Sequence, residues 1–149
     1  MVSQLRIDVG RHFRLREVHA DSNKFQSLMV ERSHAAKQES QLRSINLSCN
    51  HLGKYEGHIT GLHNLGSALL DLNLSQNFLE SISFVEGHKN SFFGLRQLRT
   101  LNLANNQIKK VYFDNTARWP SLKYLDISYN RLEGLSFLAL CEGLTVLRV

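Results

Sequence analysis

Histidine and cysteine are the side chains in this sequence best suited to hold a metal ion. Three of the seven histidines, His51, His58 and His63, follow Cys49 within 14 residues. Zinc ligands in proteins come in close, regular pairs of cysteines or histidines. The spacing here matches none of these pairs, so we interpret the histidines as scattered surface groups and predict neither a metal nor another cofactor.

The short motifs that mark many enzyme active sites are missing from the sequence. There is no glycine-rich phosphate-binding loop, no serine nucleophile elbow and no zinc-spaced cysteine pair. We therefore predict no catalytic residues and a protein that is not an enzyme.

What recurs instead is an asparagine inside a fixed apolar frame, Leu-x-x-Φ-x-Φ-x-x-Asn-x-Φ-x-x-Φ, where Φ is an apolar residue. Five asparagines occupy this position: Asn23, Asn50, Asn77, Asn106 and Asn130. In the fourth copy the frame is filled by Leu98, Leu101, Leu103, Asn106, Ile108 and Val111. Apolar residues two apart lie on one side of a strand, so Leu101 and Leu103 face a core while Asn102 faces away. An asparagine amide donates and accepts, so we expect the five to form a structural ladder that satisfies the backbone of successive turns.

This pattern resembles the leucine-rich repeat family over residues 15–149. The segments Leu-Asn-Leu-Ser and Leu-Asp-Ile-Ser-Tyr-Asn are similar to its intracellular type, with short to medium repeats. The resemblance implies an α/β fold: a right-handed solenoid with a parallel concave sheet and short helices or turns on the convex side. Repeats start at residues 15, 42, 69, 98, 122 and 144, the last one truncated.

The convex side is expected to change along the chain because repeat lengths fall from 27–29 to 22–24 residues. Helical spacing after Ser22 or Asn23 predicts a helix in the first repeat, carried by Phe25, Leu28, Met29, Arg32, Ala35 and Ala36. Pro120 limits a helix in a later repeat, where we expect Trp119 to fill the outer core.

The ends of the chain lead to two further expectations. Residues 1–14 alternate apolar and polar through Leu5, Ile7 and Val9, which predicts a cap strand or hairpin before the repeat domain of residues 15–149. The sequence stops inside a strand at Val149 without a closing segment. We expect either a fragment or splice form of a longer protein, or a second chain that covers this end.

The outward positions of the strands and their entrances are the candidate partner-binding surface. They are polar, small and little charged, which suits hydrogen bonding to a protein or peptide and is equally typical of a sheet face that meets only solvent. Two tyrosines and an aspartate form its aromatic cluster, and tyrosines are enriched in interface hot spots. The predicted contacts are Asn46, Asp71, Asn73, Arg99, Asn102, Lys123, Tyr124, Asp126 and Tyr129.

The net charge of +5 bears on the partner. A basic row at the strand entrances contains Arg16, Arg43, Arg99 and Lys123 and is interrupted by Leu70. The remaining cations are spread along the chain, so an acidic protein partner is favoured over nucleic acid. The resemblance implies a non-catalytic protein-binding scaffold or adaptor in a larger intracellular assembly, cytoskeletal, ciliary or regulatory. The alternatives are a ribonucleoprotein component that contacts RNA through this row, and the recognition module of a longer enzyme.

Cysteine use and hydropathy predict a location. Extracellular members of the family generally carry cysteine-rich caps, whereas here Cys49 and Cys141 lie about three repeats apart, too far for a disulfide. No apolar run approaches the ~20 residues of a membrane span, and no hydrophobic signal segment opens the sequence. We expect the cytoplasm, with the cytoskeleton or a cilium as settings and the nucleus as an alternative.

Overall fold

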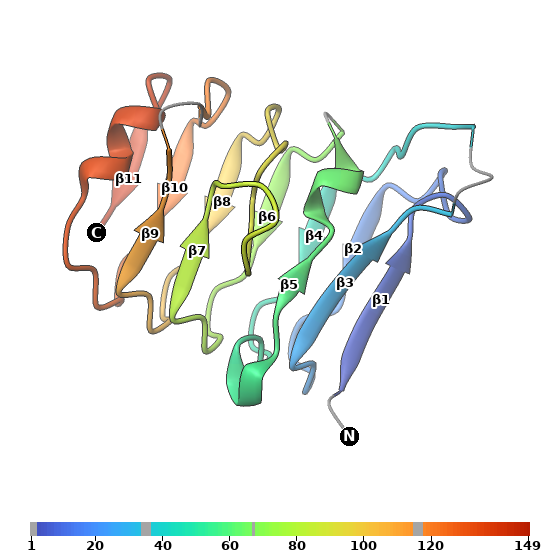
Figure 1. Cartoon of the computed structure of the whole chain (residues 1–149), viewed down its shortest axis with the longest axis horizontal. Coiled ribbons are helices and arrows are strands. Elements are labelled where there is room, and N and C mark those ends of the chain that lie inside the picture. Colours follow the sequence, from blue (N-terminus) through green and yellow to red (C-terminus); the bar gives the residue numbers. More distant parts are fainter. Residues whose placement is uncertain (1–2, 34–36, 67, 115–117) are drawn as a thin grey trace.

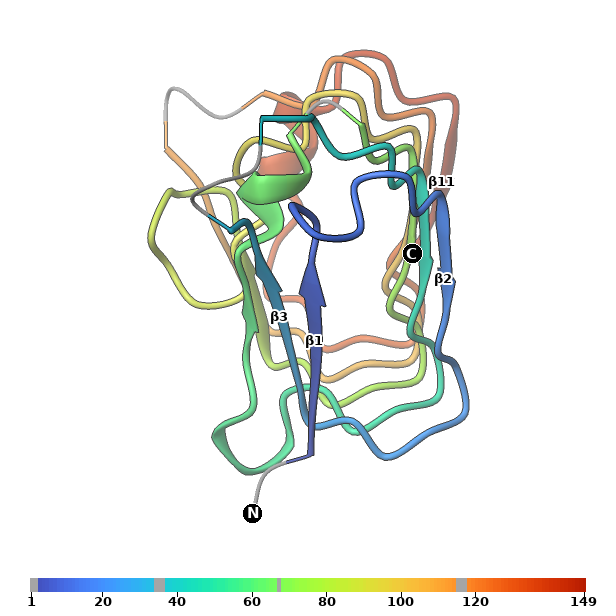
Figure 2. The same cartoon turned by 90° about the vertical axis from the view of Figure 1, so that its right-hand side faces the viewer.

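The computed structural model describes residues 3–33, 37–66, 68–114 and 118–149. Short strands follow one another along a coil, with one row of strands on each of its two faces (Figure 1). Viewed along the coil, the rows lie on opposite sides (Figure 2). The buried apolar side chains of the repeats form one core cluster. The predicted solenoid of leucine-rich repeats is confirmed.

The concave sheet contains six parallel strands in the described part of the chain. In spatial order they are β2 (Glu17–His19), β4 (Ser44–Asn46), β6 (Asp71–Asn73), β8 (Thr100–Asn102), β10 (Tyr124–Asp126) and β11 (Val146–Arg148). Each strand contributes one residue per repeat at the same register, so Ile45, Leu72, Leu101 and Leu125 are aligned and buried. The repeat pattern therefore places its leucines in one continuous core.

Trp119 fills the outer part of this core, as the sequence predicts. Its side chain is buried and meets Phe84 edge to face, with ring centroids 4.1 Å apart. Phe92 packs on it from a second side. Phe84, Phe92 and Trp119 therefore form a buried trio of aromatic rings in edge-to-face contact.

The convex face consists of strands and 3₁₀ turns. One sheet joins β1 (Gln4–Asp8), β3 (Ser27–Glu31) and β5 (Ile59–Thr60), and a second joins β7 (Ser81–Ser83) and β9 (Lys110–Tyr112). The 3₁₀ helices are η1 (Lys54–Glu56), η2 (Leu62–Leu65) and η3 (Ser136–Leu140). None of the residues that the structure describes is in an α-helix.

The helix predicted for the first repeat is therefore wrong, because Leu28 and Met29 belong to strand β3. Leu28 and Val30 are buried, and Met29 between them is half-buried, which is the alternation of a strand. β1 supplies backbone hydrogen bonds along the whole of β3, and this tertiary pairing outweighs the local helical spacing. Ala35 and Ala36 lie outside the described residues.

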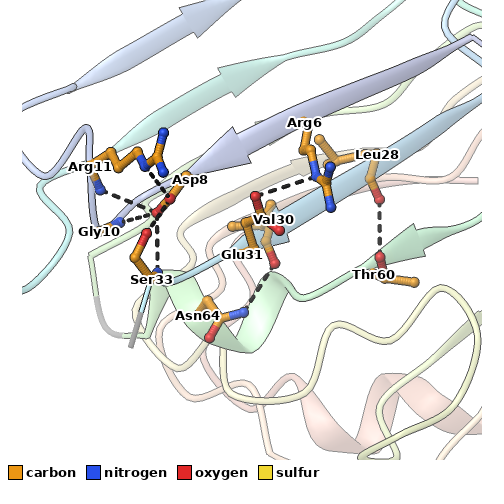
Figure 3. A network of polar contacts seen from close by, with 10 residues as sticks. All are labelled: Arg6, Asp8, Gly10, Arg11, Leu28, Val30, Glu31, Ser33, Thr60 and Asn64. Atoms are coloured by element: carbon orange, nitrogen blue, oxygen red, sulfur yellow. Dashed lines mark hydrogen bonds and ion pairs between the residues drawn. The ribbon is translucent and has the colours of Figure 1, made fainter. Parts of the chain in front are cut away.

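Residues 3–14 contribute the strand β1 and no second strand, so they form no hairpin of their own. β1 pairs in parallel with β3, and the loop after it is held by Asp8 (Figure 3). The Asp8 carboxylate accepts hydrogen bonds from the backbone N–H groups of Gly10, Arg11 and Ser33 and from the Ser33 hydroxyl. The Ser33 hydroxyl above all, helped by these N–H groups, lowers the pKa of Asp8 to about 2.

Candidate binding surface on the concave sheet

The strand register converts sequence positions into columns across the concave face. The column between the two core positions reads His19, Asn46, Asn73, Asn102, Asp126 and Arg148. The column before the first core position reads Glu17, Ser44, Asp71, Thr100, Tyr124 and Val146. The structure thus brings the predicted contacts on the strands together on one surface.

Side-chain oxygens of the middle column bind their own turns. The Oδ1 atoms of Asn46, Asn73, Asn102 and Asp126 each accept the backbone N–H two residues later, at 3.0–3.1 Å. Where that later residue is serine, its hydroxyl donates to the same oxygen. These hydrogen bonds stabilise the end of each strand. The Asn46 amide N–H donates to Asp21 Oδ1 at 3.3 Å, whereas those of Asn73 and Asn102 make no hydrogen bond among the described residues. The spacing Asn/Asp-x-Ser carried this signal in the sequence.

The asparagine ladder lies directly behind this column. The Oδ1 atoms of Asn50, Asn77, Asn106 and Asn130 accept hydrogen bonds at 2.9–3.0 Å from backbone N–H groups of the preceding repeat. Their Nδ2 groups donate to carbonyls of the preceding repeat and of their own turn. Asn23, at the start, is exposed and bonds within its own turn to Ala20 and Asp21. The four later asparagines therefore tie each turn to its neighbour.

A third column lies immediately before the ladder and has an unusual backbone. Its members, Ser22, Cys49, Gln76, Asn105 and Tyr129, all have φ between +54° and +56°. Residues other than glycine rarely adopt this left-handed conformation, and asparagine tolerates it best. The turn therefore imposes one backbone geometry on five different side chains.

Tyr124, Asp126 and Arg148 form a closed polar group at the carboxyl-terminal end of the face. The Tyr124 hydroxyl donates to Asp126 Oδ2 at 3.3 Å, and the Arg148 guanidinium lies 3.8 Å from the same oxygen. Arg148 also stacks over the Tyr124 ring, 5.6 Å from its centroid. Asp126 is buried, so its carboxylate is a structural acceptor and not an exposed charge. Tyr129 of the predicted aromatic cluster takes part in none of these contacts, and 80% of its surface is exposed.

The predicted basic row lies at one edge of the concave sheet. Its four side chains are exposed: Arg16, Arg43, Arg99 and Lys123. The backbone N–H of Arg43 donates to the Arg16 carbonyl, and that of Lys123 donates to the Arg99 carbonyl, each at 2.8 Å. Leu70 lies between the two pairs. Lys123 Nζ also donates to the Gly143 carbonyl at 3.0 Å. The edge therefore presents two pairs of cations separated by an apolar residue.

Other reactive side chains are dispersed. Within the described ranges, no three His, Cys, Asp or Glu side chains are grouped so that they could hold a metal ion. Both cysteines are free thiols, and burial raises the pKa of Cys141 to about 11. No helix among the described residues has the length and apolar composition that crossing a membrane requires.

Comparison with known proteins agrees with the repeat architecture. A family model described as "Leucine Rich repeats (2 copies)" matches residues 96–140. Toll-like receptor 9 of Felis catus is 33% identical over 107 residues, 70% of this chain and 10% of the receptor. Human Toll-like receptor 9 is 30% identical over 125 residues, 82% of this chain and 12% of the receptor. Toll-like receptor 3 of Bos taurus is 38% identical over 72 residues, 47% of this chain and 7% of the receptor. The chain spans about a tenth of the length of these relatives.

Proposed function

Because this chain belongs to the leucine-rich repeat family, whose solenoids are typically non-catalytic protein-interaction modules, we propose that it is a scaffold or adaptor that binds another protein on its concave sheet. The observation that carries this proposal is the alignment of polar side chains into columns on a sheet whose strands are fixed in register.

Preorganisation is the physical basis of binding in this proposal. The side-chain hydrogen bonds at the strand ends and those of the asparagine ladder fix the conformation of the concave face before a partner binds. Association costs conformational entropy wherever side chains and loops must be ordered on binding. A face that is already ordered avoids most of this cost, so modest polar contacts suffice for a specific complex.

The proposed setting is a cytoplasmic assembly, cytoskeletal, ciliary or regulatory, and the proposed partner is acidic. The net charge of +5 and the exposed pairs at the sheet edge support an acidic partner. The two free thiols, one of them buried, support a reducing compartment.

Affinity capture with two matched variants tests the proposed function. S44E/T100E introduces two negative charges into the concave column, where neither side chain makes a hydrogen bond among the described residues, and these charges repel an acidic partner. K110E changes an exposed residue of β9 on the opposite face. We expect a stoichiometric protein partner to copurify with the unchanged chain and with K110E and to be lost with S44E/T100E. Retention by the concave variant, or loss with K110E alone, would place binding elsewhere and contradict the proposal.

A second candidate is RNA binding along the basic edge. The exposed positions of Arg43, Arg99 and Lys123 on one edge favour it, because aligned cations attract phosphates. Charge reversal with R99E separates the candidates. Loss of RNA retention with a steep dependence on salt supports this second function, whereas unchanged RNA retention with loss of a protein partner supports the first.

A further inference from the structure

The carboxyl-terminal half of the concave face contains an open hollow of about 490 Å³. Ala104 lines it, at the position where neighbouring repeats have Ser75 and Ser128, which line it as well. Its walls include Gln76, Asn102, Asn105, Tyr129 and Arg148. These residues come from four successive repeats, so the hollow exists only in the folded solenoid.

Hydrogen bonds already made within the chain determine what this hollow can bind. Asn102 Oδ1 accepts the Ala104 N–H, and Gln76 Oε1 accepts from the Cys49 thiol. Within the described part of the chain, the amide N–H groups of Asn102 and Gln76 make no hydrogen bond. Arg148 adds a guanidinium that is largely exposed. The groups that Asn102, Gln76 and Arg148 still have available are donors, so this part of the hollow fits a ligand that presents acceptors.

Asp126 also lines the hollow but does not offset this preference. Its Oδ1 accepts from the backbone and hydroxyl of Ser128, and its Oδ2 accepts from Tyr124 and faces Arg148. A buried carboxylate with these partners has little capacity left for a basic ligand.

Tyr129 borders the hollow in a conformation that disfavours tyrosine. Its φ is +54° and its side chain is 80% exposed, so it gains little from packing in the isolated chain. Asn105 occupies the same position one repeat earlier and is better suited to this backbone. Every repeat has this backbone at this position, so the distinguishing feature of Tyr129 is a large exposed ring that lines the hollow.

We propose that this hollow binds an aspartate or glutamate side chain of an acidic peptide segment, with its carboxylate on Arg148 and the Asn102 and Gln76 amides. Tyr129 packs its ring against the neighbouring part of that segment. This inference rests on the proposed protein-binding function and assigns it a site and a ligand chemistry.

The chain offers a matched pair of tyrosines for the test. Tyr55 also has a left-handed backbone, φ +52°, and is 69% exposed, but it lies in η1 outside the hollow. Y129N and Y55N both replace tyrosine by a residue that suits this backbone. We expect each to raise the melting temperature by about 2–4 °C for a chain of this size.

Peptide selection supplies the ligand. A displayed library of random linear peptides is selected on the immobilised full chain, and the most enriched peptide is synthesised with a fluorescent label. We expect it to contain aspartate or glutamate, and its Asn or Gln counterpart to bind about tenfold more weakly, because a charge-assisted contact is lost. Y129N and R148Q should each weaken binding by about the same factor, while Y55N leaves it unchanged.

Several results would overturn this assignment. In the selection, these are enrichment of basic or neutral peptides or of no peptide. In the binding measurement, they are equal weakening of peptide binding by Y129N and Y55N, or displacement of the peptide by single-stranded RNA. In the unfolding measurement, it is a lower melting temperature for Y129N. If a captured protein partner is lost with S44E/T100E, the proposed function stands despite any of these results. Only the assignment of the hollow as the binding site is then removed. Absence of any captured partner removes both.

Discussion

The Asn77 side chain joins two repeats: its Oδ1 atom accepts a hydrogen bond from the backbone N–H of Leu52, 2.9 Å away. Its Nδ2 group donates to the Leu47 carbonyl of that same repeat at 3.0 Å. Asn77, Leu52 and Leu47 are all buried, so water cannot replace these hydrogen bonds. The stacking of neighbouring turns thus depends on one amide per repeat as well as on the apolar core.

Replacing this amide should destabilise the fold. We expect N77A to lower the free energy of unfolding by about 1–3 kcal/mol for each backbone group left without a partner. N23A is the control, because Asn23 is exposed and, among the described residues, bonds only within its own turn. It should change stability by less than about 0.5 kcal/mol. Urea unfolding followed by circular dichroism measures both. Equal losses for the two variants would show that the ladder adds nothing beyond its own turns.

Two glycines with the same backbone separate strain from steric conflict. Gly61 and Gly87 both have φ +76°, but a Cβ atom on Gly61 would lie 1.8 Å from the Val30 carbonyl oxygen, whereas Gly87 has open space. We expect G87A to cost about 1 kcal/mol from its left-handed backbone alone. G61A should cost more than twice as much, because β3 must move away from η2. Thermal unfolding of both variants tests this, and similar melting temperatures would contradict the close approach.

Asp8 should make stability depend on pH at the acidic end. Its pKa falls from 3.8 to about 2 on folding, so the folded state favours the ionised form. The stabilisation is complete above the unfolded value of 3.8 and is lost as the pH falls through about 2. D8N should therefore have a lower urea midpoint than the unchanged chain at neutral pH, and the difference should vanish below pH 2. A difference that persists there would point to hydrogen-bond geometry and not to ionisation.

The proposed cytoplasmic location has a direct chemical test. Asn46-Leu47-Ser48 and Asn73-Leu74-Ser75 match the acceptor pattern for N-linked glycans, which are added to chains in the secretory route. We expect the intact mass of the chain from its native source to be unchanged by an N-glycosidase. A mass loss that disappears in S48A or S75A would show that the chain enters the secretory route, and it would overturn this location.

Much of the concave side could be predicted from the sequence because its information is local and repeated. The apolar frame around Asn106 fixes which of Leu101 and Asn102 faces the core, and the register of each strand follows from the copies on either side. The proposed binding residues can be predicted only in part from this repeat pattern. The hollow lined by Ala104 and Tyr129 depends on how turns of successive repeats stack, which no single repeat encodes.

The convex side was harder to predict for a related reason. Leu28 and Met29 fit a helix as well as a strand when taken alone. The deciding partner is β1, which precedes the repeat pattern and pairs with all of β3. Nonlocal pairing of this kind is absent from the periodicity of residues 25–36, so the local spacing predicted the wrong element.

The convex strands also set how the coil can bend. Paired strands lie about 4.8 Å apart wherever they occur, so repeats paired on both faces advance equally inside and outside and run straight. β1, β3 and β5 form one such block and β7 and β9 another, and no ladder joins β5 to β7 in the described chain. A hydrogen bond from Ile59 N–H to Asn90 Oδ1 spans that junction. Changes of direction along the solenoid should therefore be concentrated at this junction. A long partner then meets two nearly flat parts of the solenoid, one backed by β1, β3 and β5 and one by β7 and β9, set at an angle to each other.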